Sequence, residues 1–176
     1  MPGHSVLQLP VVALEGWVRE RTTHYDPGFV SADPCFAHAH ITALGPFDPS
    51  PRAATLAAIA GLAAGTAPIR LRLADLAQFP DGIIHLVPDP DDRLRDLTGR
   101  LVAAFPDWPP YGGAFGDDPQ PHLTVDAASA EVTLDSTAAL LADVVPVDVL
   151  LDRLQLAWWE SGDCHVLHEW LLGATG

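Results

Sequence analysis

Two short segments of the chain share one pattern of a histidine, an apolar residue, a threonine and a second apolar residue. They read His-Ile-Thr-Ala at residues 40–43 and His-Leu-Thr-Val at residues 122–125. Side chains two residues apart point to the same face of a β-strand, so each segment would present an imidazole beside a hydroxyl group. Few shuffled sequences of this composition contain the pattern twice, and the pair therefore indicates a functional site.

These residue types suit acid–base chemistry at a phosphorus atom. Because imidazole titrates near neutral pH, one histidine of a pair can be neutral while the other is protonated. The neutral ring can take a proton from water or a hydroxyl group, while the charged ring protonates the leaving oxygen. Threonine hydroxyls can donate hydrogen bonds to the non-bridging phosphoryl oxygens, and this chemistry requires no metal or cofactor. The candidate catalytic residues are His40, His122, Thr42 and Thr124.

Hydrophobic periodicity predicts alternating strands and helices that would hold these segments. Strands are expected at residues 6–9, 36–45, 69–73, 82–87 and 121–125, followed by a closing pair at 147–159 and 164–172. Helices are expected at residues 10–22, from Pro51 through residue 62 with Ser50 as the N-cap, at 90–105 and at 130–143. The segment 106–121, rich in proline, glycine and aspartate, is expected to be a functional loop.

The order of these elements repeats along the chain with an offset of about 80 residues. The offset aligns His40 with His122 and Thr42 with Thr124, although other positions show little identity. Chance alternation of elements would produce a similar order. If the repeat is real, residues 1–176 form a single domain with pattern repeats at approximately 1–83 and 84–176. A pseudo-twofold axis would then bring the two histidine strands to one cleft.

The sequence resembles the two-histidine (2H) phosphoesterases, which include bacterial 2′-5′ RNA ligase-like proteins and cyclic nucleotide phosphodiesterases. The resemblance rests on the segments 40–47 and 121–125, with Pro46 and Phe47 after the first motif and Pro121 before the second. It extends over nearly the whole chain and includes the two-part repeat. The paired motifs are far more specific than either motif alone.

The resemblance implies an α+β fold of two pseudo-symmetric lobes, each an antiparallel sheet with helices on its outer side, flanking a central cleft. It also implies a metal-independent hydrolase that opens a 2′,3′-cyclic phosphate to a 2′-phosphate, with reverse 2′-5′ ligation in some members. By the same resemblance, His40 and His122 form the acid–base pair, and Thr42 and Thr124 hold the phosphate.

One departure from the family bears on the substrate. RNA-processing members often carry a basic residue just after the second motif, where this chain has Asp126 and Ala127. A small cyclic-phosphate nucleotide or an RNA end is therefore expected rather than a long RNA. Its base could stack on Phe47 or on Tyr111 of the long loop, although a core role for Phe47 and a loop anchor at Tyr111 are the structural alternatives.

Composition excludes several classes of protein. The chain has 176 residues, 23 acidic against 9 basic side chains and a net charge of −14, and it contains no lysine. Such a surface repels polyanions, which excludes a protein that coats long nucleic acids by charge alone. No secretory leader and no membrane span are expected, so the sequence favours a cytoplasmic location, and we expect a monomer. Cys35 and Cys164 match no zinc or redox spacing and are expected to be two buried thiols.

Three further features have competing interpretations. His38 and His40 lie on one strand face like a two-histidine metal arm, but no partner ligand is recognisable, so no metal is expected. Arg70 and Arg72 could line an anion site, although a solvated sheet face is favoured. Trp158 and Trp159 must point to opposite faces.

The alternative function is a nucleotide-binding module that does not turn over its ligand. The two intact motifs are evidence against this alternative, because a binding module does not need both histidines.

Overall fold

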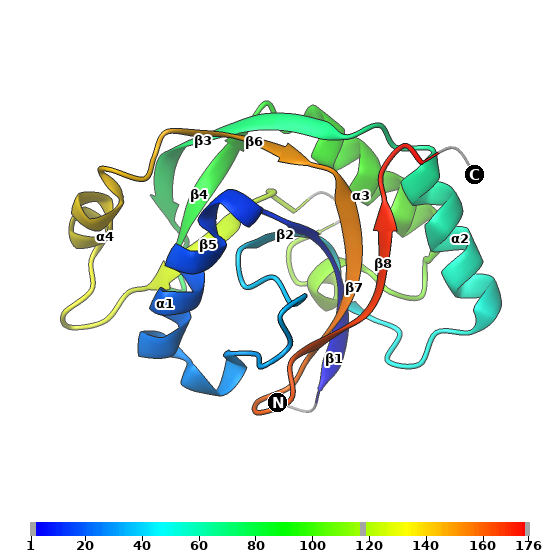
Figure 1. Cartoon of the computed structure of the whole chain (residues 1–176), viewed down its shortest axis with the longest axis horizontal. Helices are drawn as coiled ribbons and strands as arrows, with labels where there is room; N and C mark the ends of the chain where they lie inside the picture. Colours follow the sequence, from blue (N-terminus) through cyan, green and yellow to red (C-terminus); the bar gives the residue numbers. More distant parts are fainter. Residues whose placement is uncertain (1–2, 117–118, 175–176) are drawn as a thin grey trace.

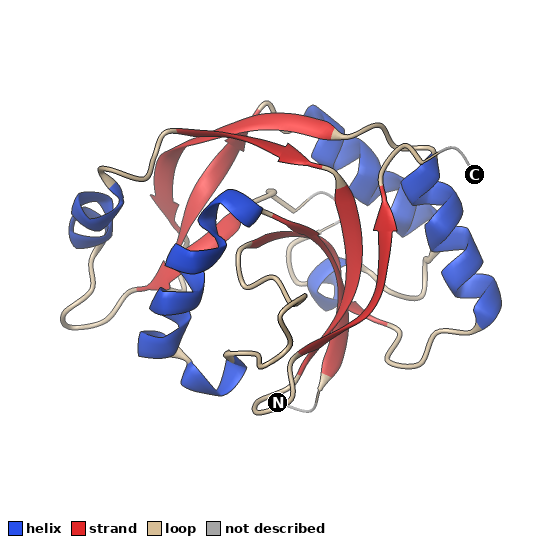
Figure 2. Ribbon diagram, in the orientation of Figure 1, coloured by secondary structure: helices blue, strands red, loops and turns tan. Residues whose placement is uncertain are grey.

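Two four-stranded antiparallel sheets form the centre of the molecule, with helices around them (Figure 1 and Figure 2). The structure is a computed structural model, and it describes residues 3–116 and 119–174. This arrangement confirms the α+β class and the two-lobed architecture that the sequence predicts. No helix within the described residues is long and apolar enough to cross a lipid bilayer.

The first sheet contains the first histidine motif at its edge. Its strand order is β2-β1-β7-β8. The strands are β1 (His4–Pro10), β2 (His40–Phe47), β7 (Arg153–Trp159) and β8 (His165–Leu171). The register pairs Thr42 of β2 with Gln8 of β1, and Gln8 with Gln155 of β7.

The second sheet contains the second motif, also at its edge. Its strand order is β5-β4-β3-β6. The strands are β3 (Ile69–Gln78), β4 (Ile83–Asp89), β5 (Leu123–Ala127) and β6 (Val147–Leu151). The register pairs Thr124 of β5 with His85 of β4, so the threonine of each motif lies opposite the second strand of its own sheet.

The prediction of a single strand at residues 147–159 is wrong. The chain leaves β6 in the second sheet, turns at Asp152 and enters β7 in the first sheet. Each sheet therefore combines strands from distant parts of the chain, because β1 and β2 pair with β7 while β3 pairs with β4 and β6. Local periodicity cannot reveal such a change of partner, since it shows which residues of a strand are buried but not which strand pairs with it.

The helices lie outside the sheets (Figure 2). They are α1 (Glu15–Tyr25), α2 (Ala53–Ala64), α3 (Asp92–Ala104) and α4 (Leu134–Leu141), with short 3₁₀ turns at Val12–Leu14, Pro27–Phe29 and Pro110–Gly113. The predicted cap at Ser50 is wrong, because α2 begins after Arg52 without a side-chain cap. In contrast, α4 begins with a capping box in which the Thr133 hydroxyl accepts from the backbone N–H of Ser136.

Alternating burial explains how the strands form the core. In β3, Ile69, Leu71 and Leu73 are buried while Arg70 and Arg72 face solvent, as the alternation predicts for a half-buried strand. Burial of a leucine or isoleucine of this kind stabilises the fold by about 1.5–3 kcal/mol. The buried stripe of α3, which is Leu94, Leu97 and Leu101, belongs to the same apolar core.

The two cysteines differ from the expectation of two buried thiols. Cys164 is buried, but Cys35 is exposed, and the two thiols are free. Cys35 lies in the irregular segment before β2, where its neighbour Phe36 takes the buried position beside Cys164.

Candidate functional site

His40 is the first residue of β2, and its ring orientation is fixed by the backbone. The ring nitrogen Nδ1 lies 2.9 Å from the carbonyl oxygen of His38. A carbonyl oxygen can only accept, so Nδ1 carries the proton in this hydrogen bond. The other nitrogen, Nε2, is therefore the atom of a neutral His40 that can take up a proton.

His122, immediately before β5, repeats this arrangement. Its Nδ1 lies 3.0 Å from the carbonyl oxygen of Gln120, again two residues earlier in the chain. Although the two histidines belong to different sheets, β2 and β5 lie against each other, and the charge of His122 is felt at His40. The structure thus brings the two predicted histidines together with their Nε2 atoms available.

The threonines share a face with the histidines in both motifs. Thr42 and Thr124 are half-buried, while the apolar residues between and after the motif residues are fully buried. The buried residues are Ile41, Ala43, Leu123 and Val125. This separation of a polar face from an apolar face is what the period of two in a β-strand requires.

A small cavity opens beside the first motif. Its volume is about 210 Å³, and it is lined by His4, Val6, His40, Thr42, Gly45, Pro46, Tyr111 and Trp159. The described residues lining it include no arginine and no carboxylate. The prediction of a solvated face on β3 is confirmed for Arg72. This residue pairs with Asp148 on the surface and does not line the cavity.

Tyr111 joins the two motifs across this cavity. Its side chain lies near that of Thr42, which opposes the rise that burial causes in the pKa of Tyr111, and its ring lies nearly parallel to that of His122, with 6.3 Å between centroids. Tyr111 also has φ 50°, a left-handed backbone conformation that is costly for a bulky residue and is concentrated at functional sites. Gly112 and Gly113 continue the left-handed turn at low cost, so the loop residues 110–113 hold the ring over the site.

Aromatic rings also surround His122 on the second sheet. Phe79 meets it edge to face at 4.9 Å, and His85 does so at 5.4 Å, while Phe79 and His85 stack on each other at 3.9 Å. His85 is 1% exposed, and neither of its ring nitrogens has a hydrogen-bond partner among the described residues. Burial, followed by repulsion from His122, lowers the pKa of His85, which is therefore neutral.

Burial controls the protonation of both motif histidines. The pKa of His40 is lowered to about 4, mainly by burial and in part by the positive charge of His122, while the hydrogen bond to His38 opposes the shift. Burial likewise lowers the pKa of His122 against the hydrogen bond to Gln120. Both rings are thus neutral near pH 7, because burial in low dielectric disfavours the charged form.

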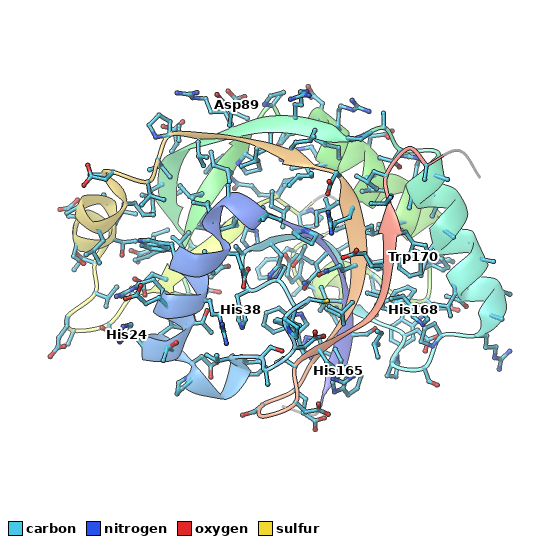
Figure 3. All side chains as sticks on the ribbon, in the orientation of Figure 1. His24, His38, Asp89, His165, His168 and Trp170 are labelled. Atoms are coloured by element: carbon cyan, nitrogen blue, oxygen red, sulfur yellow. The ribbon has the colours of Figure 1, made fainter. Side chains whose placement is uncertain are left out.

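The side chain of His38 does not join that of His40 as a pair of metal ligands. Its Nδ1 lies 2.6 Å from the carboxylate of Glu15, and its Nε2 accepts the backbone N–H of Ser31, so both nitrogens have partners. Figure 3 shows the ring beside α1, away from the histidines of the C-terminal hairpin. No group of three or more metal-ligating side chains comes together among the described residues.

Phe47 is not placed to stack on a substrate base, as one of the two predictions for it proposed. It is 1% exposed and packs against Phe105 and Trp108, so its ring is a core side chain. Trp159 takes the place beside His40 instead, with 5.0 Å between ring centroids. Its indole N–H donates to the buried Gln8, which fixes the ring. The sequence predicts that Trp158 and Trp159 point to opposite faces of the strand. It does not indicate which of the two lines a cavity.

Comparisons with known proteins give the family from the sequence and the fold from solved structures. The family model described as the 2′-5′ RNA ligase superfamily matches residues 10–163. A search of curated proteins found no match. Among solved structures, the chain is similar to TT0787 of Thermus thermophilus, with a TM-score of 0.60 and 17% identity over 98% of this chain and 100% of that chain.

A second similar structure is LigT of E. coli in complex with 3′-AMP, with a TM-score of 0.55 and 20% identity over 99% of this chain and 100% of that chain. A crystal structure described only as a phosphoesterase has a TM-score of 0.57 and 19% identity over the same shares of the two chains. At these identities the structural likeness concerns the fold, whereas the sequence model covers most of the chain. The chain therefore belongs to the 2′-5′ RNA ligase superfamily.

Proposed function

We propose that this protein opens a 2′,3′-cyclic phosphate to a 2′-phosphate by acid–base catalysis with His40 and His122, without a metal. The observation that supports this most strongly is the matched geometry of the two histidines. Each donates its Nδ1 proton to a backbone carbonyl two residues earlier and leaves Nε2 for proton transfer. A pair used only for structure would not need two identically held rings beside two hydroxyls.

The proposed step balances as an in-line displacement. The Nε2 of one neutral histidine takes a proton from water, and the water oxygen forms a bond to phosphorus. The bond from phosphorus to the 3′ oxygen breaks, and the Nε2–H of the other, protonated histidine donates its proton to that oxygen. Thr42 and Thr124 donate hydrogen bonds to the non-bridging oxygens. A 5′-hydroxyl group in place of water would form a 2′-5′ linkage by the same step.

The negative charge of the substrate favours protonation of one histidine by solvent. A cyclic phosphate carries one negative charge, and an opposite charge within about 4–6 Å favours a protonated imidazole. Binding therefore raises the pKa of the adjoining histidine, whereas the repulsion between the two rings keeps the second one neutral. One acid and one base then arise together only when the anion is bound.

The site suits a small nucleotide. The cavity of about 210 Å³ has uncharged walls apart from its histidines, and the chain carries a net charge of −14. Trp159 and Tyr111 offer aromatic faces to a base, and solved structures of E. coli LigT contain 3′-AMP, ATP or NADP+. These observations favour a mononucleotide or an RNA end over a long RNA.

The direct test is turnover of 2′,3′-cyclic AMP, GMP, CMP and UMP in the presence of EDTA. We expect hydrolysis that EDTA does not reduce and a 2′-phosphate product, identified by chromatography against both isomers. A 3′-phosphate product would mean that the other P–O bond breaks and would contradict the proposed step. Absence of turnover together with saturable nucleotide binding would favour the alternative, a binding module of the same fold.

The ring of Tyr111 is proposed to stack on the substrate base. Stacking on an aromatic side chain contributes about 1–3 kcal/mol per base, so Tyr111→Ala should raise KM by about 10-fold. Tyr111→Phe keeps the ring over His122 and should leave KM within about threefold of the wild type. Steady-state kinetics on 2′,3′-cyclic AMP measures both effects.

The matched control for Tyr111 is Tyr25→Phe, because Tyr25 is the other tyrosine of the chain and lies on α1. An unchanged KM in Tyr111→Ala would show that the ring does not contact the base. An equal rise in KM in Tyr111→Phe and Tyr111→Ala would instead assign the effect to the hydroxyl group, which lies near Thr42.

A further inference from the structure

The carboxylate of Glu15 lies behind the segment that leads into the first motif. One oxygen, Oε1, is 2.6 Å from Nδ1 of His38, and the other, Oε2, accepts the backbone N–H of Ala39 at 2.8 Å. Glu15 is the first residue of α1, so a helix outside the sheet contacts both residues that precede His40.

The direction of the hydrogen bond from His38 follows from its second nitrogen. The backbone N–H of Ser31 donates to Nε2 at 3.0 Å, which leaves Nε2 unprotonated and puts the proton on Nδ1. His38 is therefore a neutral donor to an ionised Glu15, and hydrogen bonds to ionised acceptors are roughly twice as strong as neutral ones. Burial opposes the ionised form of Glu15, but the bonds from His38 and Ala39 outweigh it and lower its pKa.

Glu15 acts just beyond the paired part of the sheet. The register of β1 with β2 begins at His40, and one further backbone bond joins the N–H of Val11 to the carbonyl of Ala39, so the peptide between residues 38 and 39 precedes these bonds. The carbonyl of His38 is the acceptor that orients the imidazole of His40 through Nδ1. Any rotation of the 38–39 peptide would therefore turn the ring of His40 away from the cleft, and the two bonds to Glu15 resist that rotation.

We propose that Glu15 is a positioning residue for His40, which fixes the ring through the 38–39 backbone and supplies a nearby negative charge that favours its protonated form. The proposal rests on the acid–base role given to His40 above. The titratable groups around His40 are Glu15 from α1, His38 before β2, His4 from β1, Tyr111 from the long loop and His122 before β5. Of these, Glu15 is the acidic group whose charge raises the pKa of His40.

The test is Glu15→Gln, which keeps the side-chain shape but removes the charge. The loss of negative charge disfavours protonated His40, so the limb of the pH profile that belongs to His40 should move to lower pH, by about half a unit or more. We also expect kcat to fall by about 10-fold with KM within twofold, because only the orientation of a reacting group changes. Glu20→Gln removes an exposed charge from the same helix and should change neither quantity.

Imidazole NMR separates this proposal from the proposed function. In the wild-type protein the Nδ1 proton of His38 should resonate far downfield, as expected for a short bond to a carboxylate, and His40 should hold its proton on Nδ1. Glu15→Gln should remove the downfield signal and mix the two tautomers of His40. These signals do not require turnover, so they decide the role of Glu15 even if no cyclic nucleotide is hydrolysed.

Two outcomes would overturn the proposal. One is a folded Glu15→Gln protein in which the pH limb and the His40 tautomer both stay unchanged. The other concerns His38→Gln, which serves if Glu15→Gln does not fold, because it removes the imidazole but keeps the charge of Glu15 and its bond to Ala39. We expect this variant to lower kcat without moving the pH limb, and an unchanged kcat would contradict the positioning role.

Discussion

Replacing either His40 or His122 with alanine is expected to lower kcat for 2′,3′-cyclic nucleotide hydrolysis by about 10²- to 10⁴-fold, the usual contribution of a general acid or base. Each variant removes one of the two proton transfers while Thr42, Thr124 and the cavity remain. The double variant should lose less than the product of the two single effects, because residues that act as a unit are not additive. Single-turnover assays with excess enzyme measure these rates without interference from product release.

His168→Ala is the control for the histidine variants. His168 is exposed on β8, lies beside Trp170 (Figure 3) with the two rings stacked, and does not line the cavity. It should retain wild-type turnover, which would show that loss of a histidine alone does not reduce activity. If His40→Ala and His122→Ala each lost less than about 10-fold while remaining folded, acid–base catalysis by this pair would be ruled out.

Asp126→Ala is expected to destabilise the protein more than the loss of an exposed ion pair would. It should lower the free energy of unfolding by roughly 3 kcal/mol. The Asp126 side chain is 0% exposed and accepts from Nε and Nη2 of Arg21 at 2.9 and 2.7 Å. It also accepts the backbone N–H of Ala127. Its removal leaves a guanidinium group that is only 19% exposed without its counter-charge, which is why the cost exceeds that of an ordinary surface pair. Urea unfolding followed by fluorescence measures the change.

Two variants test the cause of this loss. Asp148→Ala breaks the exposed pair with Arg72 and should cost less than about 1 kcal/mol. The double variant Arg21→Met with Asp126→Leu should recover much of the lost stability, because well-packed apolar residues can replace a buried ion pair. A loss below about 1 kcal/mol in Asp126→Ala would show that the pair contributes little.

Asp126 illustrates how a sequence departure is resolved by structure. The sequence shows an acidic residue where RNA-processing relatives often have a basic one, and a contact to substrate is the obvious concern. In the structure the carboxylate points to α1 and holds Arg21, so it does not face the cavity. It joins the helix that carries Glu15 to the strand that carries Thr124.

The histidine motifs are predictable because their signal is local. A period of two places His40 and Thr42 on one face and buries Ile41 whatever the rest of the chain does. Periodicity likewise correctly predicts a strand that starts at β3 and a helix that covers α3. Elements of this kind are specified by residues within a few positions of one another.

The missed features depend on contacts between distant residues. Phe47 and Trp159 are both aromatic residues on strands, and only the packing of Phe105 against one and His40 against the other separates core from cavity. Glu15 and His38 are 23 positions apart and form no recognisable spacing. Likewise, the change of sheet at Asp152 follows from strand pairing across the whole chain.

The exchange of strands between the sheets also affects how the protein is made. During synthesis, β1 and β2 emerge early, but the partner of β1 on its other side is β7, about 150 residues later along the chain. Until then β1 has an unpaired edge of the kind that invites association with other chains. Because β7 enters the first sheet directly after β6 has joined the second, both lobes are completed by one stretch of polypeptide. The first sheet, whose edge carries His40, therefore has all its strands only after β7 and β8 have been made.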